Sequence, residues 1–121
     1  MKRLAVLLLV LPLLLTGCAT LQLGADPIVV NAERTIEISR ATLDAFVRWE
    51  FNNRSKCPPE VQAVAEKVRR EAPEWFNRAM RLKLAYKQNR GPDQKADLLT
   101  ALAVLQTAAS EAATYLAKHQ R

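Results

Sequence analysis

Residues 59–89, PEVQAVAEKVRREAPEWFNRAMRLKLAYKQN, decide the fold, because apolar side chains recur in them at intervals of three and four. That spacing places the apolar side chains on one face of an α-helix, so the segment predicts a long amphipathic helix. Pro73 removes one backbone hydrogen bond and crowds the preceding turn, so we expect a kink there rather than a break. The apolar face consists of Val61, Val64, Val68, Ala72, Trp75, Ala79, Leu82 and Tyr86.

A second apolar row follows Pro73 at a spacing of four and consists of Phe76, Met80 and Leu84. A helix that is apolar on two faces usually has a neighbour on each side. The helix over 59–89 is therefore expected either at the centre of a three-helix bundle or in contact with another chain.

Two further helices are expected on either side of this segment. Asp26 and Pro27 are typical of a helix start and predict a helix over about 27–53, because Asp caps the first turn and Pro tolerates its first position. The sequence NRGPD at 89–93 combines a stop, a turn and a new cap, and it predicts a helix over about 94–118. Their apolar faces consist of Val29, Ala32, Ile36, Ser39, Leu43 and Phe46, and of Leu98, Leu102, Leu105, Ala109, Ala112 and Leu116.

These segments predict an all-α chain. Short loops favour antiparallel neighbours, so residues 26–121 are expected to form a three-helix antiparallel bundle with a kinked central helix. A long helical hairpin that closes by forming a homodimer is the alternative.

The third helix is weakly polar, since Glu111 is its sole charged residue from Leu98 to Ala117. Such a segment raises the question of a transmembrane helix. Gln106, Thr107, Ser110, Glu111 and Thr114 gather on one side of it, however, and its alanines allow close approach of other helices. We therefore expect a helix packed within the bundle.

The N-terminus has a different composition. Lys2 and Arg3 precede residues 4–15, which are apolar apart from Pro12. This run is too short to cross about 30 Å of hydrocarbon, which takes roughly 20 helical residues. It fits the apolar region of a secretory signal peptide.

The run ends in Leu15-Thr16-Gly17-Cys18, and over residues 1–20 the chain resembles the bacterial lipoprotein signal, in which Leu and two small residues precede Cys. The resemblance implies a signal peptide over 1–17, cleavage between Gly17 and Cys18, and a diacylglyceryl group on the Cys18 thiol. In double-membraned bacteria it also implies an acyl chain such as palmitate on the new amine. An ordinary signal peptide and an uncleaved anchor are the alternatives.

Residues 18–25 would then be the lipidated cysteine and a tether that reaches at most about 23 Å. The resemblance also bears on localisation, because Asp after the lipidated cysteine is similar to an inner-membrane retention signal. Residue 19 is Ala. We therefore expect a lipid-anchored protein of the cell envelope, in the outer membrane facing the periplasm rather than in the inner membrane.

The net charge is +6, and loss of Lys2 and Arg3 with the signal peptide lowers it to +4. A mildly basic surface suits anionic lipid, lipopolysaccharide or acidic peptidoglycan, and a solvated helical surface with a slight positive bias explains it as well. Nucleic acid is not an expected partner of an exported chain.

No residue pattern points to catalysis, a metal or a cofactor, so we expect no enzyme. His119 is the sole histidine and lies near the end, where fraying is expected. Glu71 and Glu74 are one turn apart, but their neighbouring arginines favour a solvated charged face. Cys57 precedes Pro58-Pro59, a position that allows either burial or partial exposure, and we expect an inert thiol, with an intermolecular disulfide as the alternative.

Two groups of residues are candidates for contact with a partner. The first is a basic stretch without an acid, which suits the C-terminal end of a helix or an anionic lipid or glycan. It consists of Arg78, Arg81, Lys83, Lys87 and Arg90. The second lies around Trp49 and Phe51, which fall outside the apolar face and either close the bundle end or form a docking patch.

These observations predict a small lipid-anchored envelope protein that acts as a non-enzymatic interaction or assembly module at a membrane surface, with an envelope protein or an anionic glycan or lipid as partner. A phage-type or toxin-linked lysis lipoprotein is one alternative. A carrier that holds an apolar ligand within the bundle is another.

Overall fold

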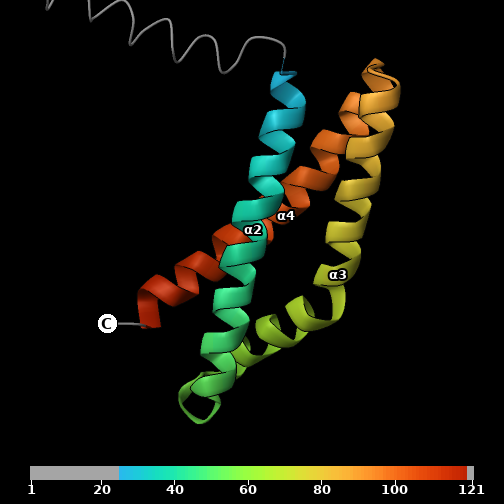
Figure 1. The fold of residues 1–121 in the computed structure, drawn as a ribbon. Helices are drawn as coiled ribbons and strands as arrows, with labels where there is room; N and C mark the ends of the chain where they lie inside the picture. Colours follow the sequence, from blue (N-terminus) through green and yellow to red (C-terminus); the bar gives the residue numbers. More distant parts are fainter. Residues whose placement is uncertain (1–24, 120–121) are drawn as a thin grey trace, which may run out of the picture.

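The computed structural model describes residues 25–119, and over that range the chain is helical (Figure 1). Three long helices form it: α2 (Pro27–Asn52), α3 (Pro59–Gln88) and α4 (Pro92–His119). A single 3-10 turn, η1 (Arg54–Lys56), connects α2 to α3. The all-α prediction is confirmed for these residues. The expected signal peptide, its cleavage site and Cys18 lie outside them.

Helix α2 begins as its sequence predicts. Asp26 is the cap, and its side chain accepts a hydrogen bond of 2.8 Å from the backbone N–H of Ile28. Pro27 occupies the first helical position. Helix α4, by contrast, begins at Pro92, two residues before the expected start, so that Asp93 lies in its first turn rather than capping it.

Helix α3 is continuous from Pro59 to Gln88 with Pro73 inside it. Figure 1 shows that the helix bends in its middle, so that its two halves run in different directions. A proline within a helix has this effect because it cannot donate to the preceding turn.

The helices pack against one another around a core drawn from all three. Helices α2 and α3 run in opposite directions, since the start of α2 contacts the end of α3 through Asp26 and Tyr86. Helix α4 starts beside the end of α3 and crosses obliquely behind α2 (Figure 1), and it contacts both helices. The least exposed large side chains of the core are Phe46, Val61, Leu98, Leu102 and Leu105.

The apolar face predicted for each helix is the face that packs inward. Its members are buried or half-buried in the bundle. The second row of α3 behaves differently, because Phe76 is buried whereas Met80 and Leu84 are 42% and 54% exposed. Helix α2 thus covers this row only in part.

Within residues 25–119, none of the helices combines the length and the apolar character that crossing a membrane requires.

Candidate functional site

The basic stretch does not form one surface. Arg78 and Arg81 are one turn apart on α3, whereas Lys83 and Lys87 lie on a different side of the helix, because residues three or four apart share a face. The stretch lacks acids in the sequence, but the fold supplies them from elsewhere. A single anionic ligand could not contact all of these side chains.

Acidic partners neutralise most of the stretch. Arg81 lies 3.2 Å from Glu74 within α3. Helix α2 provides Glu33, whose carboxylate lies 3.6 Å from the Lys83 ammonium. Arg90 lies 3.4 Å from Asp26. Among the described residues, Arg78 and Lys87 are the members without an ion pair, and both are exposed.

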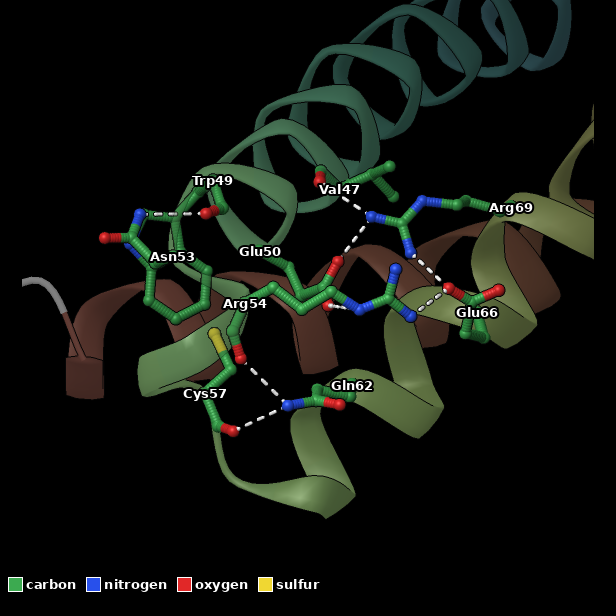
Figure 2. Close-up of polar contacts among 9 residues, drawn as sticks. All are labelled: Val47, Trp49, Glu50, Asn53, Arg54, Cys57, Gln62, Glu66 and Arg69. Carbon is green, nitrogen blue, oxygen red and sulfur yellow. Dashed lines mark hydrogen bonds and ion pairs between the residues drawn. The ribbon is translucent and has the colours of Figure 1, made fainter.

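The densest polar cluster lies where α2 meets α3 (Figure 2). It is built around Glu50, whose side chain is fully buried and is bonded by the Arg69 guanidinium. Glu66 accepts hydrogen bonds of 2.8 Å from both Arg69 and Arg54. The second oxygen of Glu50 has no hydrogen-bond partner and lies 3.7 Å from Arg54 Nε.

The hydrogen bonds of this cluster connect parts of the fold to one another. Arg69 also donates 3.2 Å to the carbonyl oxygen of Val47, and the Gln62 amide donates to the carbonyl oxygens of Arg54 and Cys57 at 2.9 and 3.0 Å. These bonds tie the end of α2 and the turn η1 to the first half of α3. Because the Glu50 carboxylate is closed off from solvent, it is not available to a ligand.

Cys57 lies beside this cluster and is buried, so of the two positions that the sequence allowed for it the structure has the buried one. Burial raises the pKa of its thiol, and the nearby Glu50 carboxylate raises that pKa further. Since the thiolate is the reactive form of cysteine, the fold lowers the reactivity of Cys57.

We expect the Cys57 thiol to be strongly protected from modification in the folded chain. A thiol reagent should label it at least about tenfold more slowly than an exposed cysteine, because both access and the thiolate fraction are reduced. Ser55→Cys, an exposed neighbour, is the matched control and should react at once. Equal labelling rates for the two cysteines without denaturant would contradict the buried position of Cys57.

A second cross-link joins the opposite ends of α2 and α3. The Tyr86 hydroxyl donates 3.0 Å to Asp26, which Arg90 also approaches. Burial opposes ionisation of Asp26, but the Ile28 N–H, Tyr86 and Arg90 outweigh it and hold the pKa of this carboxyl below its usual value. Burial, followed by the contact with Asp26, raises the pKa of Tyr86.

Stability should therefore fall at both extremes of pH. Because the pKa of Asp26 is lower in the folded chain than its ordinary value of 3.8, the ionised carboxylate stabilises the fold above pH 3.8. This stabilisation is lost as the pH falls through the folded-state pKa of Asp26. A raised Tyr86 pKa stabilises the fold below pH 10.0 and is lost at higher pH. Denaturation midpoints measured against pH should show a smaller acid dependence in Asp26→Asn and a smaller alkaline dependence in Tyr86→Phe. Unchanged pH profiles in both variants would contradict this contact.

The residues around Trp49 separate into two groups. Trp49 is half-buried and stacks on Phe46, with ring centroids 6.3 Å apart, so it closes the bundle. Phe51 points outward and is 68% exposed. His119 stacks on Trp49 and Tyr115, at 6.1 and 6.4 Å, so this residue is packed rather than frayed.

The carboxylates that could have formed an acid pair lie on the surface. Glu71 pairs with Arg70 at 3.6 Å, and Glu74 pairs with Arg81. No three His, Cys, Asp or Glu side chains between residues 25 and 119 come together as metal ligands.

The bundle also has an open groove between α2 and α3. One part has a volume of about 670 Å³ and an adjoining part about 370 Å³, and both contact Arg40 and Asp44. Its floor includes Ile36 and Phe76, and the Arg40 guanidinium lies 4.9 Å from the centre of the Phe76 ring. The lining of the larger part is Glu33, Ile36, Glu37, Arg40, Ala41, Asp44, Met80 and Lys83. An apolar floor with charged rims suits contact with a protein segment more than chemistry.

Comparison of the chain with known proteins finds no matching family model, no matching curated protein and no matching solved structure.

Proposed function

We propose that the chain is a lipid-anchored protein of the bacterial cell envelope, whose helical bundle acts as a non-enzymatic interaction or assembly module at a membrane surface. The observation that carries this proposal is the sequence Leu15-Thr16-Gly17-Cys18 after a positive end and an apolar run. Charge, apolar run, small residues and cysteine follow one another as in the bacterial lipoprotein signal, which residues 1–20 resemble.

The order of segments supports the same function. The helical bundle starts at Asp26, soon after Cys18, so a lipid on that cysteine would hold the bundle within about 23 Å of the membrane. The bundle then offers an open groove and several exposed large apolar side chains to a partner. We favour the outer membrane, facing the periplasm, because residue 19 is Ala.

Substitution of Cys18 tests the anchor. We expect the wild-type chain in the membrane fraction, labelled by radioactive palmitate and lacking residues 1–17 by intact mass. Cys18→Ala should lose the label and enter the soluble fraction, because two or three acyl chains are needed for firm anchoring. Cys57→Ala is the matched control and should keep the label. An unprocessed, unlabelled wild-type chain in the cytosol would refute the proposal.

The ion pairs of the basic stretch decide which of its residues can be substituted to test contact with a partner. Reversal of Lys83 would place like charges opposite Glu33 and disturb the fold, so Arg78→Glu and Lys87→Glu are the better variants. Because Arg78 and Lys87 lie on different sides of α3, each reversal tests one surface. Pull-down from envelope extracts should lose an anionic partner in one variant and keep it in the other. Retention of every partner by both variants would eliminate Arg78 and Lys87 as contacts and leave the groove as the candidate.

A further inference from the structure

The groove between α2 and α3 is formed by these two helices alone. Helix α4 passes behind α2 (Figure 1) and contributes no residue to the lining of either part of the groove. Pro73, at which α3 bends, lines the smaller part, so the bend holds the two helices apart. The outer side of the groove is therefore not covered by any element between residues 25 and 119.

Exposed apolar side chains continue the groove along both helices. Met80 lines it and is 42% exposed, and Leu84, four residues further along α3, shares the same side of that helix. On α2, Val30 is 40% exposed and lies three residues before Glu33, which also lines the groove. Apolar side chains that gather along one face in this way are typical of a protein–protein contact.

Two charged side chains of the groove, Glu37 and Arg40, have no ion pair within the part of the chain that the structure describes. The Arg40 guanidinium instead contacts the Phe76 ring and lies 3.9 Å from the Met80 sulfur. Since Glu37 and Arg40 are three residues apart on α2, a helix that presents an acid and a base at the same interval would pair with both. Helix α2 of a second copy is such a helix.

The two sides of the groove differ in charge. The α2 side contributes three acids and one arginine to the larger part, Glu33, Glu37, Asp44 and Arg40. The α3 side contributes Lys83, and Lys87 lies four residues further on the same side of that helix. No acid occurs between residues 75 and 90. Because complementary charges determine the register of an interface, a second copy fits with its α2 against the α3 of the first.

The size of this face suits a dimer. The 26 residues of α2 extend about 39 Å, and two adjacent helices are about 20 Å wide, so the face measures up to about 780 Å². A stable interface buries about 800 Å² on each partner. A shared membrane would favour association further, because lipid anchors raise the effective concentration of the two copies.

We propose that two copies of the chain pack together through the face formed by α2 and α3, about a twofold axis that runs along the groove. Helix α2 of each copy then lies over the groove of the other. The inference rests on the proposed function and names the partner of its groove. The axis places both Asp26 residues at one end of the pair, so both anchors reach the same membrane. An antiparallel pair would instead set the cations of the two α3 helices against each other.

Mixed cross-linking tests the arrangement. Two populations of the lipidated chain, both with Cys57→Ala, carry either Ala41→Cys on α2 or Asn77→Cys on α3. They are reconstituted together in vesicles of phosphatidylethanolamine and phosphatidylglycerol and oxidised. Ala41 and Asn77 line the groove from its two sides, so we expect a disulfide-linked pair with one chain of each kind. Thr114→Cys, on the exposed surface of α4, is the matched control and should link to Asn77→Cys at least about tenfold less.

Sedimentation equilibrium of the lipidated chain in a density-matched detergent measures the dimer itself. Met80→Glu with Leu84→Glu places two carboxylates where the acids of the second α2 approach, and should weaken the dimer at least about hundredfold. Both side chains are exposed, so circular dichroism should show the fold unchanged. Leu99→Glu, at a 40% exposed leucine of α4, is the matched control and should change the dimer by less than about twofold.

Three results would overturn the proposal. A monomeric chain, or a dimer that Met80→Glu with Leu84→Glu leaves intact, would assign the groove to a helix of a different protein. Linkage of Asn77→Cys to itself rather than to Ala41→Cys would indicate an antiparallel pair. Failure of the lipid anchor is distinguishable, because it appears as absence of the chain from vesicles, whereas the sedimentation measurement does not depend on a membrane.

Discussion

Phe46→Ala is expected to lower the free energy of unfolding by about 3–5 kcal/mol, because it removes the largest fully buried side chain of the core. The Phe46 ring stacks on Trp49 in α2 and, at a centroid distance of 6.1 Å, on Tyr115 in α4. Its loss leaves a cavity between two helices and removes both aromatic contacts. Urea denaturation followed by circular dichroism measures the change.

Phe51→Ala is the matched control for this substitution. It removes the same side chain from the same helix, but Phe51 is 68% exposed, so we expect a change within about 0.5 kcal/mol. For a domain of this size the total stability is roughly 5–14 kcal/mol, so Phe46→Ala should remove a large part of it. Equal losses for the two variants would mean that α4 does not cover α2 as described.

Arg69→Met is expected to destabilise the fold by about 3 kcal/mol, since it leaves the Glu50 carboxylate buried without its main counter-charge. Methionine keeps the apolar stem, so the loss reports on charge more than on packing. Arg54 remains 3.7 Å from Glu50 and compensates only in part. The same denaturation measurement applies.

Arg70→Met serves as the comparison for Arg69→Met. Arg70 is the next residue, its side chain is 75% exposed, and its ion pair with Glu71 is worth less than about 1 kcal/mol. Adding Glu50→Gln to Arg69→Met should recover about 1–2 kcal/mol, because a buried amide costs less than a buried charge. A loss that Glu50→Gln does not relieve would mean that packing, and not charge, dominates at this position.

The helices could be predicted from the sequence because each requires only local information. The spacing of Val61, Val68, Ala72 and Ala79 specifies one buried face whatever the neighbours are. Asp26 and Pro27 specify a helix start in the same way. Which helices approach each other, and at what angle, depends on contacts between distant residues, and so the oblique path of α4 could not be predicted.

Glu50 shows where prediction from residue type fails. The spacing of Leu43 and Phe46 continues at residue 50, so its position on the buried face was visible in the sequence. A carboxylate is not expected inside a core unless it has a partner, and the partner, Arg69, is nineteen residues away. The spacing indicated that residue 50 is buried, but a glutamate at that position argued against burial.

The basic stretch shows the opposite error. Residues 78–90 contain no acid, which indicates a positive surface when the sequence is considered alone. Antiparallel packing then brings Glu33 and Asp26 from α2 against Lys83 and Arg90. Local charge runs predict surface potential poorly where a neighbouring helix supplies the opposite sign.

The packing of α4 against α2 has a consequence for the order in which the fold closes. Leu98, Leu102 and Leu105 of α4 are almost wholly enclosed, and Tyr115 reaches back to Phe46. Residues 27–88 alone would leave that side of the core open to water. The native state therefore closes only after α4 has been synthesised.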